Sequence, residues 1–149
     1  MGLDMYLTAR KFISAYDKKN KGLNEKLKSN FPKMKSFKIE EVKFEVGYWR
    51  KANQIHNWFC VNIQNGEDNC KSYYVSEEKL KELLKLCKKV LANKKLAEKL
   101  LPTAQGFFFG SYDYDEYYFS DLENTITIIE TIFKEVNLEE YDIEYCSSW

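Results

Sequence analysis

The segment 48–59, Tyr-Trp-Arg-Lys-Ala-Asn-Gln-Ile-His-Asn-Trp-Phe, concentrates side chains that could recognise a small ligand. A planar guanidinium close to amide side chains is suited to a phosphate, a carboxylate or the edge of a base. The candidate ligand-binding residues of this segment are Trp49, Arg50, Asn53, His56, Asn57 and Trp58. The alternative interpretation is an ordinary amphipathic helix whose polar side chains face water.

A second segment, 106–119, is rich in aromatic residues, which make up eight of its fourteen positions. No single buried face can hide that many rings, and tyrosines with an apolar body and a wet hydroxyl are typical of a pocket wall. The candidate residues of this segment are Phe108, Ser111, Tyr112 and Tyr118. The alternative is a phenylalanine-rich core strand followed by a tyrosine-rich surface loop.

Catalysis and metal binding are weaker interpretations of the same segments. His56 and Cys60 are four residues apart and could share a helix face, as a thiolate nucleophile and its base would, but no third orienting group can be named. Asp113, Asp115 and Glu116, with or without His56, could bind a divalent cation, although a solvated acidic turn explains them more simply. The sequence also lacks a glycine-rich phosphate loop and the common hydrolase motifs. We therefore predict binding without catalysis, and no metal or cofactor.

The elements that must position these residues follow from hydrophobic periodicity. Alternation predicts strands over 2–9, 37–46, 72–75 and 141–148, and spacings of three and four predict helices over 48–64, 76–91, 96–101 and 120–136. These elements predict an α+β fold with a small antiparallel or mixed sheet, covered on one face by about three amphipathic helices. Without linkers or repeats, residues 1–149 are expected to form a single domain.

Local signals place several boundaries within this outline. Ser76 is suited to cap the helix that follows it, and Ser120-Asp-Leu-Glu123 is typical of a capping box that opens the last helix. An irregularity is expected in the second strand near Glu40 and Glu41. The lysine-rich stretch 16–36 predicts a mobile loop or a weak helix.

Composition excludes several classes of function. The chain has 149 residues and a mean hydropathy of −0.56, and no apolar run approaches the ~20 residues of a membrane span. Its start lacks the features of a signal peptide, so a cytoplasmic location is expected. The net charge is zero, and the acidic stretch 113–144 opposes binding to polymeric nucleic acid. Four cysteines without zinc-type spacing predict free, mostly buried thiols.

Three motifs carry a resemblance to known proteins. They are Met-Gly-Leu-Asp-Met-Tyr-Leu at 1–7, Tyr-Trp-Arg-Lys-Ala-Asn through Ile-His-Asn-Trp-Phe at 48–59, and Leu-Pro-Thr followed by Gly-Phe-Phe-Phe-Gly-Ser at 101–111. On these motifs the chain resembles a family of small proteins from bacteriophages and prophages. The resemblance implies one class of role, in which a small viral protein captures a nucleotide-derived signal of bacterial immunity in the cytoplasm of the infected host.

These observations together predict a protein that sequesters a small anionic, planar, nucleotide-like ligand, cyclic or related to ADP-ribose. A homo-oligomer is expected if the site lies between protomers. Two other functions stay open. One is a protein-binding inhibitor of a host factor that uses the acidic, tyrosine-rich surface 112–119, and the other is an enzyme that degrades the same signal.

Overall fold

The sheet contains four antiparallel strands in the order β2-β1-β4-β3. The computed structural model describes residues 2–14, 18–106 and 109–149, and the strands are β1 (Asp4–Phe12), β2 (Glu41–Arg50), β3 (Tyr73–Tyr74) and β4 (Asp142–Ser148). The predicted α+β class is confirmed, and the predicted sheet is antiparallel. Met5, Leu7 and Ala9 alternate with polar neighbours on β1 and are buried, as expected for a strand with one covered face.

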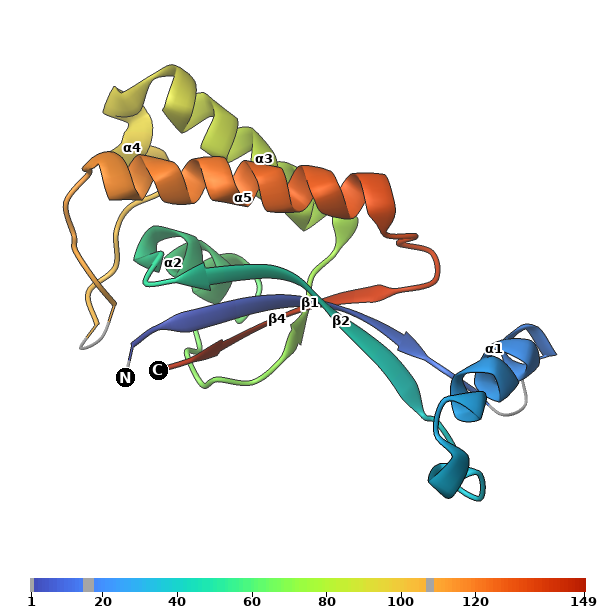
Figure 1. The fold of residues 1–149 in the computed structure, drawn as a ribbon. Coiled ribbons are helices and arrows are strands. Elements are labelled where there is room, and N and C mark those ends of the chain that lie inside the picture. The colour runs from blue at the N-terminus through green and yellow to red at the C-terminus, as the bar shows by residue number, and fades with distance from the viewer. Residues whose placement is uncertain (1, 15–17, 107–108) are drawn as a thin grey trace.

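Most of the helices cover that face of the sheet, and the first helix lies apart from it (Figure 1). The helices are α1 (Lys18–Ser29), α2 (Asn53–Asn62), α3 (Glu77–Ala92), α4 (Ala97–Leu100) and α5 (Glu116–Glu135), with short 3-10 helices at Pro32–Met34 and Lys94–Leu96. Helices α3 and α5 lie side by side above the sheet, and α2 lies between α5 and the ends of the strands (Figure 1). Their apolar faces meet the sheet in one core that includes Leu83, Leu122 and Ile129.

The chain from 37 to 52 differs from the prediction. Strand β2 begins at Glu41 and continues to Arg50, so residues 48–50 are extended, and α2 begins at Asn53. Pairing with β1 decides this, because Trp49 lies opposite Met5 and Arg50 opposite Asp4 in the register. The spacing that suggested a longer helix is therefore overridden by tertiary hydrogen bonding.

Two further local predictions were wrong in position. The irregularity in the β1–β2 pair lies between Leu7 and Thr8, opposite Gly47 and Glu45, and not at Glu40 and Glu41. Helix α5 begins at Glu116, before the predicted capping box, because the Asp115 carboxylate accepts a hydrogen bond from the Tyr118 backbone N–H at 3.0 Å. Asp is as strong an N-cap as Ser, so the earlier of the two signals sets the boundary.

Other predicted elements are present. The Ser76 hydroxyl caps α3 by accepting from the Lys79 N–H at 3.3 Å. The described part of the lysine-rich stretch forms α1 and a 3-10 helix, and residues 16 and 17 lie outside the described residues. All four cysteines are free thiols, but only two are buried, since Cys70 is exposed and Cys146 is partly exposed.

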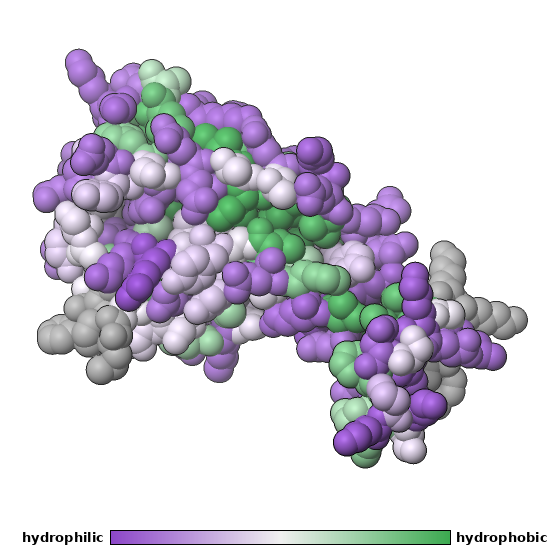
Figure 2. Space-filling view, viewed as in Figure 1, coloured by the Kyte–Doolittle hydropathy of each residue, from purple (hydrophilic) through white to green (hydrophobic). Residues whose placement is uncertain are grey.

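The α1 end of the molecule lies apart from the other helices, beyond the end of the β1–β2 hairpin (Figure 1). Apolar side chains appear there and in a band between α5 and β2 (Figure 2). The exposed large apolar residues of this end are Phe12, Phe31, Met34 and Phe37. Among the described residues, no helix has the length and apolar character needed to cross a membrane.

Candidate functional site

A pocket of approximately 490 Å³ lies where the end of β2 meets the loop before α5. The β2–α2 side contributes Arg50, Lys51 and Gln54, and the opposite wall is formed by Gly110, Ser111, Asp113, Asp115, Tyr117, Tyr118, Ser120 and Asp121. The fold thus brings together the two segments that the sequence singled out. The volume is within the range of small-molecule sites.

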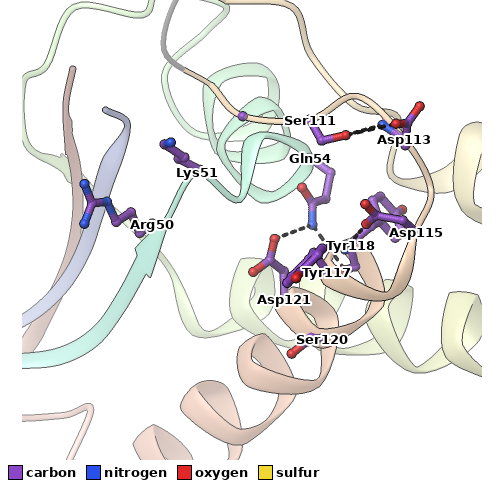
Figure 3. A pocket seen from close by; sticks show the side chains of 11 residues that line it. Arg50, Lys51, Gln54, Ser111, Asp113, Asp115, Tyr117, Tyr118, Ser120 and Asp121 are labelled. Atoms are coloured by element: carbon purple, nitrogen blue, oxygen red, sulfur yellow. Dashed lines mark hydrogen bonds between the residues drawn. The ribbon is translucent and has the colours of Figure 1, made fainter. Parts of the chain in front are cut away.

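The pocket has a cationic end and an acidic end. Figure 3 shows Arg50 and Lys51 on one side, and Asp113, Asp115 and Asp121 across from them. The Arg50 side chain is 63% exposed, and its Nε lies 4.0 Å from the Asp4 carboxylate, the limit of an ion pair. In Figure 3 the guanidinium points away from the acidic wall, so contact with a ligand in the pocket requires this exposed and loosely paired side chain to rotate.

The backbone at the pocket rim has a positive φ at two facing positions, which is strained at the lysine but not at the glycine. Lys51 has a φ of 61° and Gly110 a φ of 91°, which places both in the left-handed region. A Cβ atom added to Gly110 would lie 3.1 Å from the Lys51 Cβ and 3.3 Å from the Lys51 carbonyl oxygen. Glycine is required here so that the loop can approach β2 closely, and strain of this kind often accumulates at functional sites.

Asn53 holds the loop in place and does not line the pocket. Its Nδ2 donates to the Ser111 carbonyl at 2.7 Å and to the Phe109 carbonyl at 3.1 Å, and its Oδ1 accepts from the Ala104 N–H at 3.1 Å. The side chain is 1% exposed. The structure therefore does not bring Asn53, a predicted ligand contact, into this pocket, because its amide hydrogen bonds to the protein backbone.

Gln54, one residue further on, points into the pocket and was not singled out from the sequence. Its Nε2 donates to Asp121 Oδ2 at 3.2 Å and to the Tyr118 carbonyl at 3.4 Å (Figure 3). The pKa of the Asp121 carboxyl is raised to about 6, mainly by burial; the hydrogen bond from Gln54 lowers this pKa, and the nearby Asp115 charge raises it. A carboxyl with this pKa can accept or donate a proton near neutral pH.

Three of the four tyrosines in the loop and at the start of α5 have clearly different roles. Tyr118 is buried, its hydroxyl donates to the Leu101 carbonyl at 2.8 Å, and burial raises the pKa of this hydroxyl. The Tyr112 hydroxyl donates to the Gly106 carbonyl at 3.1 Å and so closes the loop on itself. Tyr117 is 73% exposed at the pocket rim. Tyr117 is thus the ring that a planar ligand could contact, although it was not among the predicted residues.

The remaining predicted residues lie elsewhere. Trp49 is a core residue whose indole Nε1 donates to the Thr125 hydroxyl at 2.8 Å. Asn57 and Trp58 border a separate hollow of approximately 170 Å³ next to Pro102. Phe108 lies outside the described residues. Of the ten candidates, Arg50, Ser111 and Tyr118 line the main pocket.

His56 is buried on a different side of α2. Its Nδ1 lies 2.7 Å from the Tyr145 hydroxyl, its Nε2 lies 3.0 Å from Asp68 Oδ2, and the Cys60 sulfur lies 3.4 Å from Nε2. His56 is therefore not a contact of the pocket ligand. Asp68, on the loop after α2, is the third group that the sequence could not name, because its position depends on the path of that loop.

The Cys60 thiol is not activated as a nucleophile. Burial raises its pKa to about 12, and the charges of Asp68 and Cys70 act in the same direction. Catalytic thiolates need the opposite shift. The predicted alternative of a His56–Cys60 catalytic pair thus loses its chemical basis, although the two side chains are in contact.

The alternative cation site at Asp113, Asp115 and Glu116 is not assembled either. In the described part of the chain, the ligand-type side chains with mutually close donor atoms are His56, Cys60 and Asp68. Comparison with known proteins adds no further constraint: no family model, no curated protein and no solved structure matches this chain.

Proposed function

We propose that this protein binds a small phosphate-containing, nucleotide-derived ligand in the pocket between β2 and the start of α5, and that it captures this ligand without transforming it. The observation that supports the proposal best is the division of the pocket into a cationic end, Arg50 and Lys51, and an acidic end that includes Asp113 and Asp121. A nucleotide has the same division, since its phosphate is anionic and its base and sugar carry hydrogen-bond donors.

The orientation of the ligand follows from the charges. The phosphate contacts Arg50 and Lys51. It does not bind at the N-terminus of α5, because the Asp115 carboxylate already caps that end of the helix and would repel the phosphate. Sugar hydroxyls or an exocyclic amine donate to Asp113 and Asp121 at the acidic end. Tyr117, exposed at the rim, stacks on the base.

The resemblance to small bacteriophage proteins supplies a biological setting for such a pocket. A protein that captures a cyclic or ADP-ribose-like immune signal in the host cytoplasm lowers its free concentration and so weakens the defence. A homo-oligomer whose ligand site lies between protomers remains part of this proposal.

A degrading enzyme is the second candidate, and one observation favours it. Asp121, with its pKa raised to about 6, is placed in the pocket where a general acid or base would act. The exposed Tyr112, Tyr114 and Tyr117 favour the third function, an inhibitor that binds a host protein.

One experiment separates these functions. Thermal melts of the purified protein with a panel of mononucleotides, cyclic nucleotides, dinucleotides and ADP-ribose are expected to show a rise in Tm with at least one compound. Denaturation then releases the bound compound for mass analysis. Recovery of the intact compound supports capture, and recovery of an altered compound supports the enzyme. The absence of any Tm shift would contradict both small-molecule functions and favour the protein-binding inhibitor.

Arg50→Ala is expected to abolish the ligand-induced Tm shift or weaken binding at least tenfold, because a charge-assisted phosphate contact contributes about 1.5–3 kcal/mol. Arg10→Ala is the matched control, since the chain has two arginines and Arg10 lies at the other end of β1, paired with Glu144 at 3.1 Å. Isothermal titration compares the two variants. Equal affinities of the two variants would remove Arg50 from the site.

Asp121→Asn is expected to raise the stability of the ligand-free protein at pH 7.5 by about 1 kcal/mol, after allowance for partial solvent screening. Folding raises the carboxyl pKa from 3.8 to about 6. Between pH 3.8 and pH 6 the carboxyl is therefore mostly protonated in the folded state and mostly ionised in the unfolded state. The stabilising effect of that proton is present at acid pH and is lost as the pH rises through about 6. Urea unfolding at pH 4.5 and 7.5 checks this, because the advantage of the Asp121→Asn variant should shrink at the lower pH.

A further inference from the structure

A second cluster of polar side chains lies on the other side of α2 and has no part in the proposed ligand pocket; two of its members, His56 and Cys60, are buried, and the Asp68 side chain is 28% exposed. His56 and Cys60 are one helical turn apart on α2, and Asp68 reaches them from the following loop. The donor atoms of the three side chains all lie within 4.8 Å of one another. We propose that His56, Cys60 and Asp68 form a binding site for a divalent transition metal of the Zn²⁺ type.

Two of the three distances are close to those around a tetrahedral ion. Zn–N and Zn–O bonds of about 2.0 Å and Zn–S bonds of about 2.3 Å place an N–S pair about 3.5 Å apart and an N–O pair about 3.3 Å apart. The observed separations are 3.4 Å from His56 Nε2 to Cys60 Sγ and 3.0 Å from Nε2 to Asp68 Oδ2. These two pairs need shifts of only a few tenths of an ångström. The third pair, Cys60 Sγ and the Asp68 carboxylate, lies within 4.8 Å, whereas a tetrahedral site needs about 3.5 Å, so Asp68 must move toward the sulfur by up to about 1.3 Å to admit the ion.

The ligand types select the class of metal. One imidazole, one thiolate and one carboxylate suit Zn²⁺, whereas Mg²⁺ and Ca²⁺ prefer sites made of oxygen ligands alone. The thiolate and the carboxylate also balance the charge of the ion, so the occupied site is neutral. Neutrality matters here because His56 and Cys60 are both buried.

Neighbouring side chains already orient two of the ligands. The Tyr145 hydroxyl lies 2.7 Å from His56 Nδ1 and can accept a hydrogen bond from the Nδ1–H group when Nε2 binds the metal. The Trp149 indole Nε1 donates to Asp68 Oδ1 at 3.0 Å, which leaves Oδ2 facing His56. Outer hydrogen bonds of this kind are typical of metal sites.

Gln64 supplies an independent observation at the same place. Its side chain is 1% exposed, and its Oε1 accepts from the Cys60 thiol at 3.2 Å. Its Nε2 is buried without a hydrogen-bond partner among the described residues, which is costly for a donor. Turning the amide by 180° would aim Nε2 at the sulfur, where it would donate to a metal-bound thiolate. Metal binding would thus give Nε2 a partner, while Oε1 would take the unpartnered position that Nε2 holds now.

The test uses the full chain, stripped of metal with a chelator and then titrated with Zn²⁺ or Co²⁺. We expect one equivalent of either ion, a rise in Tm, and a thiolate-to-metal charge-transfer band with Co²⁺. Cys60→Ser should remove the band, and Cys60→Ser and Asp68→Asn should each weaken Zn²⁺ binding at least tenfold. Circular dichroism and urea unfolding without metal verify that both variants fold.

Cys70→Ser is the matched control, since Cys70 is an exposed thiol two residues after Asp68. This variant should retain one equivalent of Zn²⁺ and the Co²⁺ band. Substoichiometric binding by the unmodified protein would overturn the proposal. A Co²⁺ band that survives in Cys60→Ser would also overturn it. A band that is lost in Cys70→Ser but not in Cys60→Ser would assign the binding to the exposed Cys70 thiol instead. None of these readouts depends on the nucleotide pocket, so the metal-site proposal and the ligand-binding proposal are tested independently of each other.

Discussion

Replacement of Asn53 by alanine is expected to destabilise the protein by about 3 kcal/mol and to lower Tm by roughly 10 °C. The variant removes three hydrogen bonds between α2 and the loop, to Ala104, Phe109 and Ser111. Buried backbone groups left without a partner cost about 1–3 kcal/mol each, although water can reach part of this loop. Urea unfolding measures the loss of stability.

Hydrogen exchange locates the effect of the same substitution. The Ala104 N–H donates to Asn53 Oδ1 at 3.1 Å, so its exchange should accelerate in Asn53→Ala. Asn57→Ala, one turn further along α2, is the control, because its amide makes only a long 3.4 Å contact with the Pro102 carbonyl. We expect that control to change stability by less than about 0.5 kcal/mol. Similar losses in the two variants would contradict the assignment of Asn53 as the residue that holds the loop.

Gly110→Ala is expected to lower the free energy of unfolding by about 2 kcal/mol and to weaken ligand binding at least tenfold. A φ of 91° costs an L-residue about 1–2 kcal/mol. The new methyl group would also press on Lys51, at 3.1 Å from its Cβ and 3.3 Å from its carbonyl oxygen. The loop must then move away from β2, which separates the acidic wall of the pocket from Arg50 and Lys51. Urea unfolding and titration with the nucleotide found in the melts measure the two effects.

Gly66→Ala is a closely matched control for this prediction. Gly66 has a similar φ of 82°, but a Cβ added there would meet no atom within 4 Å. This variant should show the backbone strain alone, about 1 kcal/mol, and unchanged binding. If Gly110→Ala were no worse than Gly66→Ala and bound the nucleotide equally well, the close approach of the loop to Lys51 would not be what forms the pocket.

Prediction from the sequence succeeded where a local signal and its tertiary setting agreed. The alternation of Met5, Leu7 and Ala9 and the Ser76 cap of α3 both depend on neighbours in the chain, and both are present in the structure. Prediction failed at Trp49, where helical spacing competed with strand pairing to β1. It also failed at Ser120, where an equally good cap, Asp115, occurs five residues earlier.

The candidate site shows the same limit. Segment composition drew attention to 48–59 and 106–119, and residues of both segments line the pocket. It could not distinguish Asn53, which binds the protein backbone, from Gln54, which reaches into the pocket with Asp121. The two amides are adjacent in the chain and chemically equivalent, so only the direction of each side chain separates their roles.

The sequence alone indicated the α+β class, the apolar face of β1 and the two segments whose residues line the pocket, because hydrophobic period and residue type are local properties. The tertiary structure decided which of those residues meet. It placed Arg50 on a strand end across the pocket from Asp121, and it brought Asp68 to the buried His56 and Cys60. Such contacts join residues that are distant in the chain, and they depend on strand register and on the path of loops, which long-range packing fixes.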